Sequence, residues 1–510
     1  MAVILAGGML LTGCSASDGS GSASDGGAGK AWGDGPVPAP APAQSQATGE
    51  GAQGEQRDGD EREFAPTPPP DYLSTFALDV DTASYGFARR TLAEGRLPDP
   101  ATVRPEEFVN SFRQDYPQPE GDGFTVTVDG ARTDSTGWSL VRVGLATRAS
   151  AAGAERPPAA LTFVIDISGS MAEPGRLDLV RESLGIMTDQ LRADDSVALV
   201  TFSDEAETVL PMTRLGGHRE RIHSVIDRLE PTDSTNVEAG IRTGYDTAVQ
   251  GLRDGATNRV VLLSDALANT GETSADAILE RIADARREHG LTLFGVGVGS
   301  QYGDALMERL ADKGDGHTTY VSTIEDARTV FCEQLPANIE LRARDAKAQV
   351  AFDPETVEQF RLIGYDNRQV ADEDFRNDRV DGGEVGPGHT VTALYAVRTK
   401  PGGSGHVATA SVRWLDPDSR APHEASGQIE SGALDGSLWQ AGSGLRVAAV
   451  AAYFADALRT PAGTGRWDPL PGAPSMAELV GQAEELAYTT RDEAVRGLAD
   501  AVRQAGRLRA

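Results

Sequence analysis

The sequence is poor in cysteine, lysine and histidine. Only Cys14 and Cys332 occur among the 510 residues, which excludes a fold held together by several disulfides. The seven histidines show no spacing typical of metal ligands or of catalytic groups. Only four of the 47 basic residues are lysines, and the formal net charge of −30 excludes attraction to nucleic acid or to anionic lipid. Hydrophobic residues make up 39% of the chain, enough for the cores of two to four domains.

An apolar segment stands at the N-terminus. It ends in Leu11-Thr12-Gly13-Cys14, which resembles a bacterial lipobox. The resemblance implies a lipoprotein signal peptide over residues 1–14, lipid on Cys14, and a chain anchored outside the cytoplasm in the bacterial cell membrane. No basic residue precedes the apolar run, which leaves open a true start codon further upstream.

Residues 15–70 consist mainly of small, polar and proline residues, with almost no large apolar side chain. Such a composition buries too little surface to offset the entropy of ordering, so we expect a disordered tether. A tether behind a lipidated cysteine would lift the folded part off the membrane.

The remaining sequence divides into four expected regions. Residues 71–157 combine helical patterns with alternating strands, residues 158–340 alternate strands and helices, residues 341–440 are β-rich, and residues 441–510 are helical. The alternation over 158–340 predicts an α/β fold, a doubly wound and mostly parallel sheet of six strands with crossing helices.

Oxygen-bearing side chains stand at the expected strand and helix ends of residues 158–340. An apolar run ends in an aspartate that two serines follow at alternate positions, a threonine precedes a helical pattern, and a second apolar run ends in another aspartate. The residues are Asp166, Ser168, Ser170, Thr235 and Asp265. The carboxyl ends of parallel strands meet at one edge of a sheet, so these side chains should converge there. Oxygen ligands suit a hard cation, and Mg²⁺ is favoured over Mn²⁺ or Ca²⁺ because it binds through one or two carboxylates and retains waters.

This constellation resembles the metal-ion-dependent adhesion site (MIDAS) of a von Willebrand factor type A domain. The resemblance implies that the five residues hold a divalent cation. Beyond this region, the chain resembles bacterial lipoproteins of the YfbK type. The segments that carry this second resemblance are Ser74–Pro119, Phe360–Arg368, Asp372–Asp381 and Gly388–Tyr395.

Alternating strands on both sides of residues 158–340 suggest how the regions are joined. We expect the later strands to pair with the earlier ones in one β-sandwich, so that the type A domain is inserted in or flanked by a β-rich domain. The earlier strands are expected at 124–128 and 138–145, and the later ones at 349–352, 390–398 and 407–414.

Two acidic segments suggest other sites. Asp79-Val80-Asp81-Thr82 looks like the opening motif of haloacid-dehalogenase phosphatases, but no convincing lysine and acidic pair follows. We favour the interpretation that Asp81 caps a helix starting near Thr82. The run Asp372–Glu384 has the composition of a calcium loop without EF-hand spacing, so a solvated loop is favoured.

The expected function is binding and not catalysis. Two carboxylates and three hydroxyls leave a divalent cation with an open coordination position, which suits an acidic side chain of a protein ligand. We therefore expect a cell-surface lipoprotein that binds a protein partner and is not an enzyme. The alternatives are an envelope scaffold whose ion stabilises loops and, less favoured, a metal-assisted hydrolase or phosphatase, which would also need a positioned base or nucleophile. The sequence names neither the ligand nor the oligomeric state.

Overall fold

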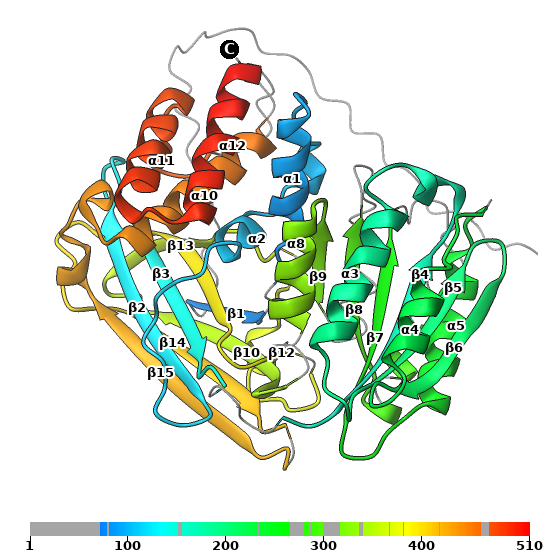
Figure 1. Ribbon diagram of the computed structural model, residues 1–510. Helices are drawn as coiled ribbons and strands as arrows, with labels where there is room; N and C mark the ends of the chain where they lie inside the picture. Colours follow the sequence, from blue (N-terminus) through cyan, green and yellow to red (C-terminus); the bar gives the residue numbers. More distant parts are fainter. Residues whose placement is uncertain are drawn as a thin grey trace, which may run out of the picture. The chain divides into compact units, whose positions relative to one another are not determined.

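Three β-sheets organise the computed structural model of the chain (Figure 1). The residues that the structure describes are 72–78, 81–150, 156–232, 234–265, 280–285, 288–298, 317–335, 340–366, 368–380, 382–417, 419–460 and 469–509. The expected signal peptide at 1–14 with Cys14 and the expected tether at 15–70 lie outside them. All described residues belong to one unit, Ala65–Ala510. No helix among them combines the length and the apolarity needed to cross a membrane.

The largest sheet has six strands in the order β6-β5-β4-β7-β8-β9. They are β4 (Ala159–Asp166), β5 (Ser196–Phe202), β6 (Ala206–Arg214), β7 (Thr257–Ser264), β8 (Thr292–Val298) and β9 (His317–Val321). Neighbouring strands run parallel except β6, which pairs antiparallel with β5 at the edge. The prediction of a doubly wound, mostly parallel sheet is confirmed.

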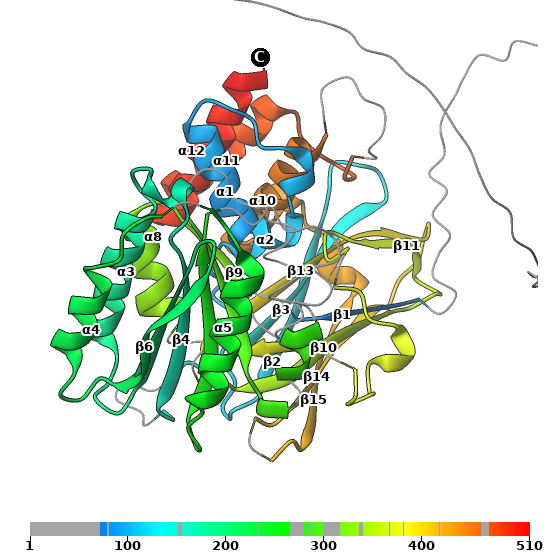
Figure 2. The ribbon, with the colours of Figure 1, turned by 90° about the vertical axis from the view of Figure 1, so that its right-hand side faces the viewer.

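Helices cover both faces of this sheet, and its strands are therefore buried on both sides. On β4, Phe163 and Ile165 belong to the core on one face, and Val164 belongs to the core on the other. The first face carries α3 (Leu177–Gln190), α4 (Arg219–Ile226), α8 (Ile324–Arg328) and the π-helix Thr329–Gln334, and the second carries α5 (Val237–Gln250). Figure 2 shows α3 and α4 on one side of the sheet and α5 on the other.

Helix α5 lies unusually close to the sheet. A Cβ atom on Gly244 would lie 2.3 Å from Val164 Cγ2, and one on Gly240 would lie 2.6 Å from Phe202 Cδ1. Glycine therefore permits the close approach of α5 to β4 and β5. This contact fixes where the loop that precedes α5 lies relative to the ends of the strands.

The other two sheets face each other as a β-sandwich. The first has the order β1-β10-β14-β15, with β12 also paired to β10, and the second has the order β11-β13-β3-β2. The strands are β1 (Leu73–Ala77), β2 (Phe124–Arg132), β3 (Trp138–Thr147), β10 (Ala343–Phe352), β11 (Val357–Leu362), β12 (Gly383–Val385), β13 (Thr390–Thr399), β14 (His406–Leu415) and β15 (Pro422–Glu430). Both sheets contribute to one hydrophobic core.

Each sheet of the sandwich combines strands from before and after the six-stranded sheet. β1 pairs with β10, and β3 pairs with β13. The six-stranded domain is therefore inserted between β3 and β10, as expected. The later strands are split between the sheets, because β13 joins β2 and β3 while β10 and β14 lie in the facing sheet.

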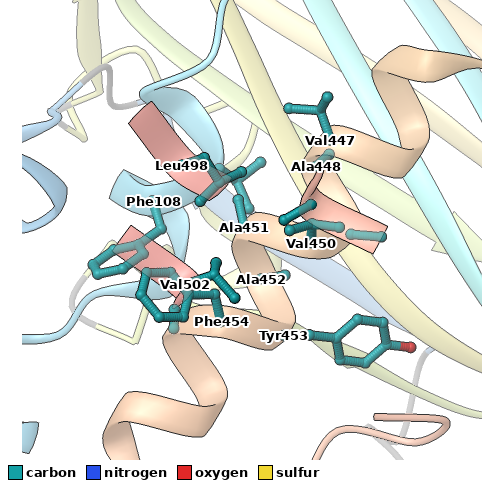
Figure 3. Packing of buried hydrophobic residues seen from close by; sticks show 14 of the residues in the cluster. Phe108, Val447, Ala448, Val450, Ala451, Ala452, Tyr453, Phe454, Leu498 and Val502 are labelled. Atoms are coloured by element: carbon teal, nitrogen blue, oxygen red, sulfur yellow. The ribbon is translucent and has the colours of Figure 1, made fainter. Parts of the chain in front are cut away.

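A layer of helices covers the outer face of the second sheet. It comprises α1 (Ala83–Ala93), α2 (Pro105–Asn110), α10 (Ser443–Arg459), α11 (Met476–Thr490) and α12 (Glu493–Arg509). Helix α10 is buried on nearly all sides, because Leu140 and Leu394 of the sheet, Phe108 of α2 and Leu498 of α12 surround it. Figure 3 shows Phe108 of α2 and Leu498 of α12 beside the side chains of α10. Short 3₁₀ turns occupy Pro100–Thr102, Gly169–Ala172, Asp372–Asp374, Ser431–Leu434 and Leu438–Gln440.

Asp81 does not have the capping role expected of it. The N-cap of α1 is Thr82, and the buried carboxylate of Asp81 accepts hydrogen bonds from the backbone N–H of Thr318 at 2.5 Å and from Arg368 Nη2 at 3.1 Å. It thus joins β9 to the β-rich part of the chain.

The acidic run 372–384 is also more ordered than the expected solvated loop. Lys347 on β10 is 1% exposed, and its ammonium group donates to the carbonyl oxygens of Asn377 at 2.6 Å and Val380 at 2.8 Å. Further along, Glu384 is buried and pairs with the buried Arg259 of β7 at 3.0 Å. The run therefore supplies backbone carbonyl groups to the buried ammonium group of Lys347, and it ends in an ion pair with Arg259 of the inserted domain.

Candidate metal centre

The candidate centre lies at the topological switch point of the six-stranded sheet. From β4 the chain continues to β5 on one side of β4 and later returns as β7 on the other side. Open α/β sheets bind ligands at such a point, beyond the carboxyl ends of the strands. Asp166 is the last residue of β4, and Asp265 follows the last residue of β7. The fold therefore brings these two aspartates to one place.

Asp166 is fully buried and held in one orientation. Its Oδ1 accepts the backbone N–H of Ser168 at 2.8 Å, and its Oδ2 accepts the hydroxyl of Ser264 at 2.6 Å. Burial raises the pKa of Asp166, and the negative charge of Asp265 raises it further, against the lowering effect of the two serines. The charged carboxylate therefore lacks a sufficient counter-charge in the protein itself, and a bound cation would supply one.

The two serines of the motif are presented by a short turn. Ser168 is the N-cap of the 3₁₀ turn Gly169–Ala172, and its carbonyl accepts the N–H of Met171 at 2.9 Å. Met171 is 1% exposed and packs into the core beneath the sheet edge. One buried methionine thus anchors the turn while Ser168 and Ser170 stay at the edge.

Oxygen atoms of three of the predicted residues form a continuous series. Ser168 Oγ lies 3.1 Å from Ser170 Oγ, and Ser170 Oγ donates to Asp265 Oδ1 at 2.8 Å. Mg²⁺ binds oxygen at about 2.1 Å in octahedral geometry, so neighbouring ligand oxygens lie about 2.9 Å apart. The spacing and the hard oxygen chemistry of these side chains therefore fit a small divalent cation.

Thr235 is placed at the same edge by its backbone neighbours. The N–H of Thr232 donates to the carbonyl of Ile167 at 2.6 Å, and the N–H of Asn236 donates to the carbonyl of Ser203 at 2.6 Å. Asn236 also caps α5, accepting the N–H of Ala239 at 3.0 Å. Among the described residues no direct contact joins the Thr235 side chain to the other four predicted ligands. The structure therefore brings four of the five residues together and sets the fifth in the adjacent loop.

Two residues that contact the predicted ligands were missed by the sequence analysis. Ser264 orients Asp166, and a polar residue closing an otherwise apolar strand was the available signal. Arg176 is 3% exposed and pairs with Asp265 Oδ2, while its Nη1 also donates to the carbonyl of Ser170 at 2.9 Å. Nothing in the local sequence shows that this arginine points back to the strand ends.

Clusters of three or more histidine, cysteine, aspartate or glutamate residues able to hold a metal ion are absent from the described part of the chain. A centre at Asp166 and Asp265 would combine the two carboxylates with the hydroxyl oxygens of the neighbouring predicted residues. This donor set differs from that of a zinc site, which takes nitrogen and sulfur ligands.

Residues 160–333 match the family model of the von Willebrand factor type A domain. The chain carries a von Willebrand factor type A domain. Residues 338–496 match the model described as uncharacterized protein YfbK, C-terminal, and residues 58–139 match a model described as von Willebrand factor. The predicted type A domain and the predicted relation to YfbK are confirmed.

The chain is also similar to individual proteins. The chain is 37% identical to uncharacterized protein YfbK of Escherichia coli (strain K12) over 336 residues, which are 63% of this chain and 57% of YfbK. It is 26% identical to inter-alpha-trypsin inhibitor heavy chain H3 of Rattus norvegicus over 178 residues, 33% of this chain and 20% of that protein. Among solved structures it is similar to a von Willebrand factor type A protein from Catenulispora acidiphila, with 14% identity, a TM-score of 0.43, and coverage of 74% of this chain and 88% of that one. The chain thus spans little more than half the length of YfbK.

Proposed function

We propose that this protein is a cell-surface lipoprotein that captures a protein ligand through a divalent cation. Type A domains generally serve protein interaction, and the relatives define the role no further. In the proposal, Asp166, Ser168, Ser170, Thr235 and Asp265 hold Mg²⁺, or Mn²⁺ or Ca²⁺ in its place. The bound cation would act as a Lewis acid with one coordination position left for an acidic side chain of the ligand.

The oxygen series at the switch point of the sheet is the observation that carries this proposal. Ser168, Ser170 and Asp265 already lie at the spacing of neighbouring metal ligands, with oxygen–oxygen distances of 3.1 and 2.8 Å. Asp166 and Asp265 are buried, whereas Ser170 and Thr235 are only half-buried. The two carboxylates and the buried hydroxyl of Ser168 thus form the inner side of the centre, and the hydroxyls of Ser170 and Thr235 form the side open to a ligand.

The chemistry of the centre favours binding over hydrolysis. A metal-assisted hydrolase needs a base or nucleophile beside the ion. Asp166 accepts hydrogen bonds through both oxygens, and Asp265 accepts one from Ser170 and pairs with Arg176 through its other oxygen. His218, His223 and His406 make their hydrogen bonds elsewhere in the fold. We therefore propose a binding module and not an enzyme.

The proposed location rests on the sequence Leu11-Thr12-Gly13-Cys14. Lipid on Cys14 would anchor the chain to the bacterial cell membrane, and the acidic, proline-containing segment after it would serve as the tether. Labelling cells with an alkyne fatty acid should mark the wild-type protein and leave Cys14→Ser unmarked. Equal labelling of both proteins would contradict lipid attachment at Cys14.

Partner capture from cell-envelope extract tests the binding function. Wild-type protein in millimolar Mg²⁺ should retain a partner that EDTA releases and that Asp166→Asn fails to retain. Asp254→Asn is a matched control, because Asp254 is exposed in the turn before β7, at the opposite edge of the sheet. Circular dichroism should show Asp166→Asn folded. A partner retained equally by all three proteins would contradict the proposal, and a melted type A domain in Asp166→Asn would favour the scaffold alternative.

A further inference from the structure

Arg176 places a permanent positive charge beside the candidate metal centre. Its guanidinium pairs with Asp265 Oδ2, donates to the carbonyl of Ser170 at 2.9 Å, and pairs through Nη2 with Glu173 Oε2 at 2.6 Å. Arg176 is 3% exposed and Asp265 is 1% exposed, whereas the Glu173 side chain is 65% exposed. The strong interaction of Arg176 is therefore the buried one with Asp265, since exposed pairs are screened by water.

The backbone around Arg176 fixes the direction of its side chain. Gly175 has a φ of +84°, a conformation that favours glycine, and its N–H donates to Asp178 Oδ1 at 2.9 Å. Arg176 is the N-cap residue of α3, and its carbonyl accepts the N–H of Val180 at 2.9 Å. With the backbone held by this turn and by the helix, the side chain closes the loop that begins at Ser170.

Asp265 divides its two oxygens between different partners. Oδ1 accepts the hydroxyl of Ser170, on the side where the predicted ligands converge, and Oδ2 accepts the guanidinium of Arg176. The guanidinium therefore occupies the oxygen of Asp265 that does not bond to Ser170, and it can remain paired while a cation binds at Oδ1. It neutralises one of the two carboxylate charges of the centre.

The net charge of the centre follows directly. Asp166 and Asp265 carry two negative charges, and Arg176 reduces the sum to one. A divalent cation bound to this set leaves a net charge of about +1, whereas the same set without Arg176 would be neutral. A positive centre binds its own cation less tightly and attracts an external carboxylate more strongly.

We propose that Arg176 is a built-in counter-cation that sets the affinity of the centre for divalent ions and holds Asp265 in place before an ion binds. This inference rests on the proposed metal-binding function and adds a residue to it. Arg176 is a positioning residue, because it acts on the ion through Asp265. A merely structural role would stabilise the loop to the same extent with and without a cation.

A matched control exists at the amino ends of the strands of the same sheet. Arg156 pairs with the buried Asp195 at 2.6 Å, just before β5 begins. The Arg156 side chain is 11% exposed and that of Arg176 is 4% exposed, so both are largely buried arginine–aspartate pairs. Only Arg176 adjoins the predicted metal ligands.

The experiment compares the full-length wild-type protein with Arg176→Met, Arg176→Lys and Arg156→Met. The Kd for Mn²⁺ is measured by calorimetry, and the thermal midpoint is measured in EDTA and in saturating Mn²⁺. Arg176→Met should bind Mn²⁺ at least about tenfold more tightly than wild type, because one positive charge beside the ion is removed. It should also melt earlier than wild type in EDTA and recover most of that difference in Mn²⁺.

The two other variants separate charge from structure. Arg176→Lys keeps the charge and should bind Mn²⁺ within about threefold of wild type. Arg156→Met should melt earlier to the same extent in both conditions, with an unchanged Kd. Unchanged or weaker Mn²⁺ binding by Arg176→Met, or a lysine variant that changes as much as the methionine variant, would overturn the inference. Absence of Mn²⁺ binding in wild type would instead overturn the proposed function.

Discussion

The two ends of the central sheet each bury an aspartate, but they use it differently. At the amino end of β5, Asp195 accepts hydrogen bonds from Arg156 Nη1 and Nη2 at 2.9 and 2.6 Å and from the N–H groups of Ala159 and Arg192 at 2.7 Å each. At the carboxyl end of β4, Asp166 accepts one N–H and one hydroxyl.

The difference in hydrogen bonding gives the two carboxyl groups opposite pKa shifts. Burial alone would raise the pKa of Asp195, but the guanidinium and the two N–H groups outweigh it and hold the pKa below its usual value. Burial dominates at Asp166, and the pKa is raised. A buried carboxylate whose lone pairs are satisfied by the protein stabilises the fold, whereas one that is oriented but not neutralised is available to a cation.

The largest expected effect is the loss of cation binding in Asp166→Asn. Removing the charge of a predicted ligand should weaken Mn²⁺ binding by more than about 100-fold, since even outer-shell partners contribute about 10- to 100-fold. In EDTA the free energy of unfolding should stay equal or rise, because the variant no longer buries a poorly compensated charge. Calorimetry and urea unfolding measure the two quantities. Retained Mn²⁺ affinity would contradict the claim that the aspartate at the carboxyl end of the sheet binds a cation.

At the other end, Asp195→Asn should lower the free energy of unfolding by about 3 kcal/mol, because it leaves donors of a buried network without their charged acceptor. The Kd for Mn²⁺ should not change. Urea unfolding in EDTA gives the free energy. A loss below about 1 kcal/mol would show that the amino end does not depend on this carboxylate.

A smaller effect is expected for Ser264→Ala, which removes the hydroxyl that orients Asp166. Mn²⁺ binding should weaken by about tenfold, as for outer-shell groups at other metal sites. The thermal midpoint in EDTA serves as the control and should change little. Unaltered affinity would mean that Asp166 is oriented without Ser264.

The smallest effect concerns pH. Because the folded-state pKa of Asp195 is lowered, its contribution to stability is present above the unfolded-state pKa of about 3.9 and is lost as the pH falls through the folded-state value. The difference in unfolding free energy between wild type and Asp195→Asn should therefore be constant from pH 7 to about pH 5 and shrink in more acidic solution. Urea unfolding across this range measures it, and a difference independent of pH would contradict the assignment of the shift.

Much of the inserted domain could be predicted from sequence, because its strands are continuous apolar runs that end in polar residues. The continuous apolar run Ser196–Phe202, for example, forms β5. The proximity of Asp166 and Asp265 could be predicted for the same reason, because each stands at the end of such a run and the strand ends share one edge of a parallel sheet.

Other features depend on contacts between distant segments and could not be predicted. The direction of Arg176 depends on a loop that closes back to Ser170, and the partners of Asp81 come from Thr318 and Arg368. The partition of the later strands between two sheets depends on which edges pair, and the alternating pattern does not specify this. Glu384 was part of an acidic run whose buried partner, Arg259, lies in the inserted domain.

The position of the bound cation is the most direct test of this account. Crystals of the protein soaked in MnCl₂ and measured at a wavelength where manganese scatters anomalously should show one strong peak within bonding distance of Ser168 Oγ and Ser170 Oγ, between Asp166 and Asp265. Crystals of Asp166→Asn should show none there. A wild-type peak at another site, or none at saturating Mn²⁺, would contradict the metal-dependent binding that the account proposes.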